Sequence, residues 1–285
     1  MHDLAYYNGN FMPINDVKIS PLDRGFLFAD GVYEVVPVYN KNPFFFGEHI
    51  DRLFRSLNKI KLDPCIKKDE IKRSIEELII QTKHRHQIVY IQITRGVAYR
   101  NHAFPKSNRP TIFIMSSELL RPTEEMFAEG ISAITTNDNR WKSCDIKSIS
   151  LLPNVLAREE AIELDCQEAI LVDNGNVTEG AASTIWIVKQ GKVFCPEPCN
   201  NLLEGIRIKI IEKLCSQLEI LFERRNFKVS ELMNADEILL TSATKEILPI
   251  TSVNGKKIGI KNLKGKPGII FQKLRQRYTE LILSN

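Results

Sequence analysis

The chain begins with short runs in which apolar and polar residues alternate, a pattern typical of half-buried β-strands. An Asn-Gly pair separates the first two runs, and because such pairs adopt the positive φ angles of a tight turn, residues 5–13 are predicted to form a hairpin. Further strands are expected over residues 32–39, where Pro37 indicates a sheet edge or a bulge, and over residues 43–46. The same turn signal recurs at residues 174–175 and 254–255.

The apolar residues then recur at every third or fourth position, which predicts amphipathic helices over residues 47–62 and 68–82. Strands are expected to follow over residues 88–96 and 110–117. The first part of the chain therefore combines strands with helices. The polar segment 118–130 is the best candidate for a linker to the rest of the chain.

The second half alternates strands and helices in the same way. Strands are predicted over residues 131–136, 168–173, 183–194 (a hairpin turning at Gln190-Gly191) and 237–250, and helices over residues 155–165 and 205–218. We therefore predict a mixed α/β (α+β) fold with a small N-terminal α/β domain (residues 1–117), a linker (118–130) and a larger C-terminal domain (131–285).

Composition narrows the classes of function. The 285 residues, 43% of them hydrophobic, are enough for two domains. The 39 basic and 35 acidic side chains nearly balance and are scattered along the chain, so nucleic acid is not expected as a partner. The 6 cysteines lack the paired spacings of a zinc site or a disulfide framework, and we expect no metal.

The N-terminus has acidic residues and an early turn where a signal peptide would have a basic start and a long apolar run. No segment approaches the roughly 18 consecutive apolar residues of a membrane span. We therefore expect a cytoplasmic protein without membrane contact.

Two residues have a context that suggests chemistry. Lys147 lies among small and apolar residues just before a predicted helix, and an amine removed from water is more readily neutral and nucleophilic toward carbonyl carbons. Glu179 precedes a run of small residues that would let a bulky group approach, so its carboxylate could pair with a ring nitrogen. On the local sequence alone, a lysine that reaches solvent and a solvated glutamate in a turn remain open alternatives.

Two segments have the character of phosphate-binding sites. Gly205 opens a predicted helix, and the run "LTSATKE" ends a strand with small hydroxyl residues. Exposed backbone N–H groups and helix N-termini attract anions, although neither segment is a Walker loop or a dinucleotide-binding fingerprint. Arg52 could equally lie on the solvated face of its helix, and Tyr33 could be a core ring. Arg100 and His102 lie on a loop directly after a strand, where binding groups often occur.

A nucleophilic lysine, a carboxylate, phosphate-binding segments and an arginine together make up a pyridoxal phosphate site. Over essentially its whole length the chain resembles the fold-type IV pyridoxal-phosphate enzymes, and within them the D-amino acid transaminases. The motifs that carry the resemblance are "DRG..F.DGVYEVV.VYN", "EHIDRL", "QITRG...R.HAFP", "RW..CDIKS...L", "VTEG..S" and "TS.T.EI.P".

The resemblance implies a two-domain fold with a barrel-like C-terminal α/β domain and pyridoxal 5′-phosphate as cofactor. Lys147 would be the Schiff-base lysine and the catalytic acid and base, and Glu179 would pair with the pyridine nitrogen. The groups expected to bind the phosphate are the Arg52 side chain, the backbone amides of Ile206 and Ala243, and the Thr244 hydroxyl.

The same resemblance implies that Tyr33, Arg100 and His102 bind the substrate carboxylate, the latter two reaching across from the partner subunit of a homodimer. The expected reaction exchanges the amino group of D-alanine and other D-amino acids with 2-oxo acids such as 2-oxoglutarate, by a ping-pong mechanism through pyridoxamine phosphate.

Three other functions stay open. Aminodeoxychorismate lyase shares the fold, the lysine and the glutamate, but the Arg100-x-His102 pair favours a D-transaminase. A branched-chain L-transaminase would be expected to have a more apolar substrate loop. A cofactor-binding regulator without catalysis is disfavoured by the intact Lys147.

The chain departs from the family pattern at the start of one helix. The family usually has Gly-Ile-Thr-Arg, whereas this chain has Gly205-Ile206-Arg207-Ile208. Arg207 replaces a phosphate-binding hydroxyl, and we expect it either to add a positive charge near the phosphate or to point outward from the helix.

Overall fold

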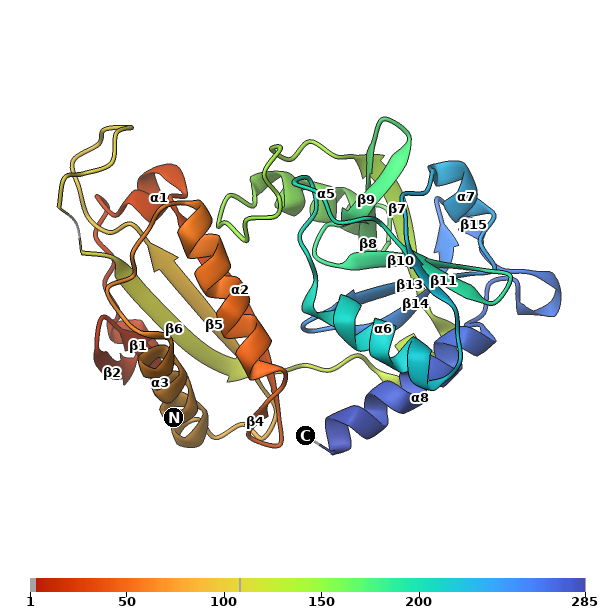
Figure 1. Cartoon of the computed structure of the whole chain (residues 1–285), viewed down its shortest axis with the longest axis horizontal. Coiled ribbons are helices and arrows are strands. Elements are labelled where there is room, and N and C mark those ends of the chain that lie inside the picture. The colour runs from red at the N-terminus through yellow and green to blue at the C-terminus, as the bar shows by residue number, and fades with distance from the viewer. Residues whose placement is uncertain (1–3, 108, 285) are drawn as a thin grey trace. The chain divides into compact units, whose positions relative to one another are not determined.

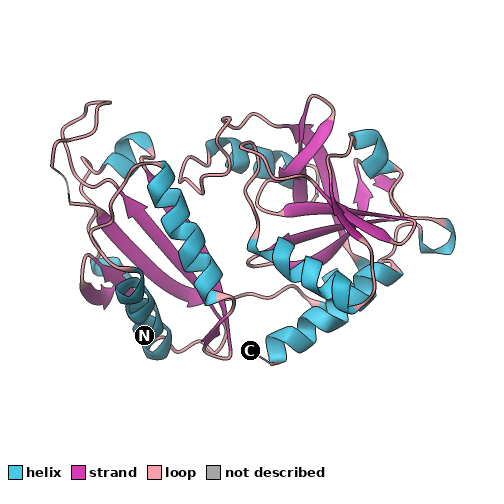
Figure 2. Ribbon diagram, in the orientation of Figure 1, coloured by secondary structure: helices cyan, strands magenta, loops and turns pink. Residues whose placement is uncertain are grey.

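The computed structural model describes residues 4–107 and 109–284. The chain divides into two compact units (Figures 1 and 2). The first unit contains the residues up to Leu120 together with Ile146–Ser150, and the second contains Arg121–Asp145 and Leu151–Ser284. The segment 118–130, expected to be a linker, contains a short helix, α4 (Glu124–Glu129).

In the described residues, the sheet of the first unit has the strand order β2-β1-β6-β5-β3-β4, and neighbouring strands are antiparallel. The strands are β1 (Leu4–Tyr7), β2 (Asn10–Pro13), β3 (Gly31–Tyr39), β4 (Asn42–Pro43), β5 (Gln87–Thr94) and β6 (Thr111–Glu118). The predicted hairpin is confirmed, since Asn8 and Gly9 both have positive φ, as do the Asn-Gly pairs at 174–175 and 254–255.

Two sequence predictions concern the chain around β4, namely the position of Pro37 and the strand over residues 43–46. The Pro37 carbonyl accepts a hydrogen bond from the backbone N–H of Phe44, so the Pro37 nitrogen faces the β4 side of β3, where the ladder reaches only Val38 and Tyr39. Pro37 was predicted at an edge or a bulge; β3 lies between β5 and β4, but β4 pairs with only its last two residues, so the missing N–H of Pro37 breaks no ladder bond. The strand predicted over residues 43–46 is wrong, because Phe45 has a left-handed φ of 53° and Phe46 already begins a helix.

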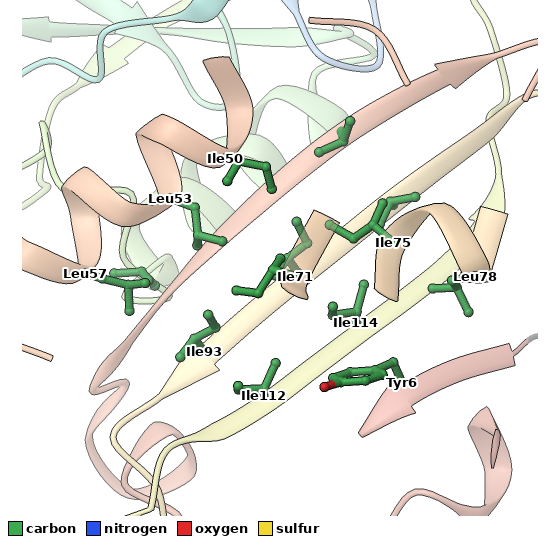
Figure 3. Packing of buried hydrophobic residues seen from close by; sticks show 14 of the residues in the cluster. Tyr6, Ile50, Leu53, Leu57, Ile71, Ile75, Leu78, Ile93, Ile112 and Ile114 are labelled. Atoms are coloured by element: carbon green, nitrogen blue, oxygen red, sulfur yellow. The ribbon is translucent and has the colours of Figure 1, made fainter. Parts of the chain in front are cut away.

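Two helices cover one face of this sheet, as the spacing of apolar residues predicted. They are α2 (Phe46–Lys59) and α3 (Lys68–Gln81). Their buried side chains pack on alternate residues of β3, β5 and β6, which face the same side because side chains alternate along a strand (Figure 3). The labelled members of this core are Tyr6, Ile50, Leu53, Leu57, Ile71, Ile75, Leu78, Ile93, Ile112 and Ile114.

A short helix, α1 (Arg24–Phe28), precedes β3. The carboxylate of Asp23 caps it by accepting a hydrogen bond from the backbone N–H of Gly25 at 2.7 Å. The same carboxylate accepts hydrogen bonds from the hydroxyls of Thr94 at 2.7 Å and Thr111 at 2.6 Å. The start of α1 is thereby fixed to the ends of β5 and β6.

The second unit is built on a sheet with the order β12-β11-β10-β13-β14-β7-β8-β9, and β15 pairs with β14 in the described residues. The strands are β7 (Ile131–Asn137), β8 (Glu168–Asp173), β9 (Asn176–Gly180), β10 (Thr184–Lys189), β11 (Lys192–Cys195), β12 (Phe222–Arg224), β13 (Glu237–Ser242), β14 (Glu246–Val253) and β15 (Lys256–Lys257). Only residues 181–183 join β9 at one end of the order to β10 near the other end, so the sheet curls around.

The longer helices of the second unit are α5 (Leu152–Glu163), α6 (Ile206–Gln217) and α8 (Ile269–Leu283), and α7 (Val229–Met233) is short. Single 3₁₀ turns occur in the first unit at Ile14–Asp16 and in the second at Lys261–Leu263. The mixed α/β class and the curled sheet confirm the predicted fold class. No helix in residues 4–107 and 109–284 is long and apolar enough to cross a membrane.

Candidate active site

Lys147 belongs to the segment Ile146–Ser150, which lies along the start of β3 in the first unit. The Tyr33 N–H donates to the Lys147 carbonyl at 2.9 Å, and the Ile149 N–H donates to the Gly31 carbonyl at 3.2 Å. A Cβ atom at Gly31 would be 2.7 Å from the Ile93 carbonyl oxygen on β5 and 3.1 Å from Cδ1 of Ile149, so glycine lets both neighbours pack closely against β3. The backbone of Lys147 is thus fixed against the outer side of β3.

The side chain of Lys147 is half-buried, and its Nζ lies 4.1 Å from the ring centroid of Tyr33. An aromatic face attracts a cation at this distance. The Lys147 N–H also donates to the hydroxyl of Ser56 on α2 at 3.2 Å. The structure therefore brings together two of the residues that the sequence singled out.

Arg52 is buried, with an exposed fraction of 7%, so the alternative of a solvated helix face is wrong. Its Nε and Nη2 donate to the two carboxylate oxygens of Glu34 on β3, at 2.9 and 2.6 Å. His49 Nδ1 lies 3.0 Å from Glu34 Oε1. A two-pronged pair of this kind fixes the plane of the guanidinium.

Glu34 and His49 are both fully buried, and the sequence analysis did not identify either. Burial by itself raises the pKa of Glu34, but the charges and hydrogen bonds of Arg52 and His49 outweigh it and hold the pKa well below its ordinary range. A signal was present in the sequence, because Glu34 alternates with Val32 and Val36 and therefore occupies a core-facing position of its strand.

Arg100 and His102 are both exposed and lie on the loop of residues 95–105 in the first unit. The Arg100 guanidinium is 5.3 Å from the ring centroid of Phe28, and the His102 ring is also 5.3 Å from it. In the described part of the chain, no hydrogen bond or ring contact joins this pair to Tyr33 or Lys147. The structure gathers Arg100 and His102 at one aromatic ring but not at Lys147.

Glu179 lies on β9 of the second unit with an exposed fraction of 8%, so the alternative of a solvated turn is wrong. It accepts a hydrogen bond from Arg140, whose Nε and Nη2 donate to the Asp138 carboxylate at 2.8 and 2.7 Å. Burial opposes the charge, yet the hydrogen bond to Asp138 and the charge of Glu179 raise the pKa of Arg140. Arg140 was not assigned a role from the sequence, although it lies in the "RW..CDIKS" motif.

A pocket in the second unit opens beside Glu179. Its lining includes Thr178, Thr184 and Leu203, together with Ile208 from the first turns of α6. Both polar and apolar groups therefore line the pocket beside the carboxylate.

Ile206, Ala243 and Thr244 lie at two neighbouring turns of the second unit. Ile206 is the first residue of α6, whose N-terminal N–H groups have no acceptor within the helix. Ala243 and Thr244 form the hairpin turn between β13 and β14, so the single strand predicted over residues 237–250 is corrected to a hairpin. Within residues 4–107 and 109–284, no acceptor is found for the backbone N–H of Ala243 or Thr244.

Arg207 connects these two turns. Its side chain is buried, with an exposed fraction of 3%, so the outward orientation is wrong. Nε donates to the hydroxyl of Tyr278 at 3.3 Å and Nη2 to the carbonyl of Ala243 at 3.4 Å. Burial raises the pKa of Tyr278, and the positive charge of Arg207 opposes that rise.

The chain is similar to known proteins of one family. The family model for amino-transferase class IV matches residues 31–253. The D-alanine aminotransferase of Staphylococcus haemolyticus is 36% identical over 281 residues, covering 98% of both chains. That of Bacillus licheniformis is 36% identical over 279 residues, covering 98% of this chain and 96% of its own.

Solved structures show the same fold. The branched-chain amino acid aminotransferase of Escherichia coli has a TM-score of 0.91 at 24% identity, covering 99% of this chain and 95% of its own. The branched-chain amino acid aminotransferase of T.th., solved with pyridoxamine 5′-phosphate, also has a TM-score of 0.91, at 23% identity, covering 100% and 95%.

The chain belongs to the class IV aminotransferases, so the resemblance seen in the sequence is confirmed. It is a pyridoxal phosphate-dependent aminotransferase whose substrates are small amino acids and 2-oxo acids. The residues fit this cofactor, because two N–H groups that have no acceptor in the described part of the chain lie beside a helix N-terminus, and a buried carboxylate lines a pocket at the same helix.

Proposed function

We propose that the enzyme transfers the amino group of D-alanine and other D-amino acids to 2-oxo acids such as 2-oxoglutarate or pyruvate. The observation that carries this choice is the loop of residues 95–105, which places the cationic Arg100 and the imidazole of His102 at one ring. The D-alanine aminotransferases that are similar over nearly the whole chain support it.

The cofactor-binding residues in this proposal are those that the family resemblance implies. Arg52 binds its phosphate together with the N–H groups of Ile206 and Ala243 and the hydroxyl of Thr244. Glu34 supports this role, because its carboxylate fixes the orientation of the Arg52 guanidinium. Pyridoxal phosphate, when bound, supplies an electron-withdrawing ring that stabilises negative charge at the α-carbon of the amino acid.

Lys147 and Glu179 carry the chemistry. The Lys147 amine would hold the cofactor until the amine of the substrate displaces it, and the freed Lys147 amine would then take the proton from the α-carbon. Glu179 would accept a hydrogen bond from the protonated ring nitrogen, and Arg140 keeps this carboxylate in place through its ion pair. The Tyr33 ring beside the amine restricts where Lys147 can reach.

The substrate carboxylate is bound by Tyr33, Arg100 and His102. We assign Arg100 and His102 to the partner subunit of a homodimer, which is consistent with the absence of any contact from them to Lys147 in the described residues. The proposal also retains a cytoplasmic enzyme and a domain division at residues 1–117, 118–130 and 131–285.

Parallel assays with D-alanine, L-leucine and aminodeoxychorismate test this function. D-alanine with 2-oxoglutarate should give the highest kcat/KM. A preference for L-leucine would favour a branched-chain transaminase, and release of pyruvate from aminodeoxychorismate would favour a lyase. Either result would overturn the proposed substrate.

A further inference from the structure

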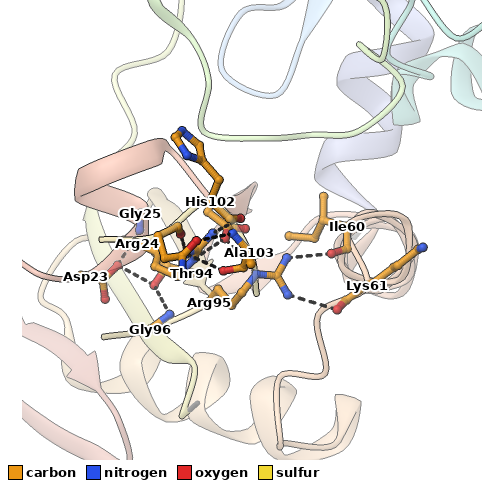
Figure 4. Close-up of polar contacts among 12 residues, drawn as sticks. Asp23, Arg24, Gly25, Ile60, Lys61, Thr94, Arg95, Gly96, His102 and Ala103 are labelled. Carbon is orange, nitrogen blue, oxygen red and sulfur yellow. Dashed lines mark hydrogen bonds and ion pairs between the residues drawn. The ribbon is translucent and has the colours of Figure 1, made fainter. Parts of the chain in front are cut away.

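The loop that carries Arg100 and His102 is held by a buried arginine outside it. Arg24, the first residue of α1, has an exposed fraction of 3%. Its Nη1 donates to the carbonyls of Asn101 at 2.5 Å and Ala103 at 3.3 Å, and its Nη2 donates to the carbonyl of His102 at 3.4 Å (Figure 4). One guanidinium thus binds three successive carbonyls of the loop.

We propose that Arg24 is a positioning residue for substrate binding, because it sets the conformation of this loop and with it the direction of the Arg100 and His102 side chains. The proposal rests on the proposed function for the roles of Arg100 and His102. The part that concerns the loop's conformation depends only on the contacts of Arg24.

The bonds of Arg24 fix the backbone on both sides of His102. The Asn101 carbonyl belongs to the peptide plane before His102, and the His102 carbonyl belongs to the plane after it. Since each peptide is planar, fixing both carbonyls restricts φ and ψ of His102 and therefore the direction of its Cβ. The backbone N–H of Arg24 also donates to the Gly96 carbonyl at 2.9 Å, where the loop begins.

The same short helix supplies the ring against which the loop side chains lie. Phe28, the last residue of α1, has its ring centroid 4.9 Å from the Arg24 guanidinium. Arg100 and His102 contact this ring at 5.3 Å each. Helix α1 therefore fixes both the backbone of the loop and the position of its two functional side chains.

A carboxylate holds Arg24 in this orientation. Asp30 Oδ2 accepts hydrogen bonds from Arg24 Nε at 2.7 Å and from Arg95 Nε at 2.8 Å. Arg95 in turn donates to the carbonyls of Ile60 at 2.7 Å and Lys61 at 3.1 Å, at the end of α2. The planar fork of Arg24 reaches four acceptors at once, which the single ammonium of a lysine cannot do.

The test is Arg24→Lys in the full-length holoenzyme, which keeps the charge and removes the fork. In peptides covering residues 97–105, hydrogen–deuterium exchange without substrate should be at least about tenfold faster at the amides of Ala98 and Ala103, whose N–H groups have acceptors, and unchanged in peptides covering β5. KM for D-alanine should rise at least about tenfold, while kcat changes by less than about threefold. The matched control is Arg225→Lys, which removes a fork from Glu231 and the Asn226 carbonyl in the second unit and should change neither quantity.

The outcomes separate this inference from the proposed function. Unchanged loop exchange in Arg24→Lys overturns the inference. It is also overturned if Arg24→Lys has faster loop exchange but an unchanged KM, while Arg100→Met has a raised KM. If Arg24→Lys has faster loop exchange and neither Arg24→Lys nor Arg100→Met changes KM, the carboxylate-binding role of Arg100 is refuted. The conclusion that Arg24 sets the conformation of the loop would then still stand. If Arg24→Lys does not fold, Asp30→Asn should give faster loop exchange, and unchanged exchange in that variant overturns the inference.

Discussion

At the scale of single residues, the first unit contains a carboxylate whose charge is matched by two basic groups. Glu34 is fully buried, and Arg52 and His49 both bind its oxygens. Glu34→Gln removes the carboxylate charge that both groups bind and should lower the free energy of unfolding by about 3–5 kcal/mol at pH 7, measured by urea denaturation. The control Glu223→Gln, which loses an ion pair with Lys192 near the surface, should change it much less.

This effect should depend on pH in one direction. Because the pKa of Glu34 is lower in the folded than in the unfolded chain, its charge stabilises the fold above the ordinary carboxylate pKa of about 4.3. The contribution is lost as the pH falls from there toward the folded-state pKa. The stability difference between wild type and Glu34→Gln should therefore shrink below about pH 4, and a difference that grows on acidification would contradict this assignment.

A second residue-scale prediction concerns Lys147. Its half-buried amine over the Tyr33 ring should carry the cofactor, so borohydride reduction followed by peptide mapping should place the cofactor mass on the peptide containing Lys147. Lys147→Gln should abolish this labelling and the activity. The exposed Lys142→Gln, which loses only its ion pair with Asp173, should retain both. Label on another lysine would disprove the assignment.

At the scale of secondary-structure elements, the sequence predicted those whose pattern is local. The period of apolar residues located α2 and α3, and the Asn-Gly pairs located three hairpins. The strand at residues 43–46 was wrong because a run of aromatics is typical of strands, whereas packing and a left-handed Phe45 start a helix there. Helix α8 was missed, although its buried Phe271 and Leu274 have helical spacing.

The residues of the candidate site also divide into those that a local motif identifies and those that it does not. Lys147 and Glu179 were identified from their motifs, but nothing local in the sequence indicates that Arg140 pairs with Glu179 or that Arg24 holds the loop of residues 95–105. These partners are distant in sequence, so only the tertiary fold brings them together.

The neighbouring turns at α6 and the β13–β14 hairpin allow a prediction at this scale. Arg207 donates a hydrogen bond to the Ala243 carbonyl. Because the peptide bond is planar, the Thr244 N–H points away from Arg207, so Arg207 fixes the direction of this N–H group. Arg207→Met should lower the affinity for pyridoxal phosphate about tenfold, measured by fluorescence titration of the apoenzyme, and Arg207→Lys should lower it less. The control is Lys213→Met, at an exposed position of the same helix, which should leave the affinity unchanged. An unchanged affinity in Arg207→Met would exclude any role of Arg207 at the phosphate.

At the scale of the whole molecule, the proposed homodimer can be tested by complementation. Arg100→Met and His102→Leu should each lower kcat/KM for D-alanine at least about tenfold and leave the cofactor spectrum intact. If Arg100 acts across the interface, dissociating and reassociating Lys147→Gln with Arg100→Met should give hybrid dimers with one intact site. The mixture should then regain about one quarter of wild-type activity, whereas sites built within one subunit would regain none.

The segment Ile146–Ser150 matters for synthesis of the chain on the ribosome and for expression of the first unit alone. It covers the outer edge of β3 at Gly31 and Tyr33, yet it is translated after the rest of the first unit and after part of the second. A nascent chain that ends at Leu120 therefore exposes an unpaired strand edge, the kind of surface that recruits other chains into aggregates. Anyone who expresses the first unit alone should graft residues 146–150 onto its C-terminus through a flexible tether.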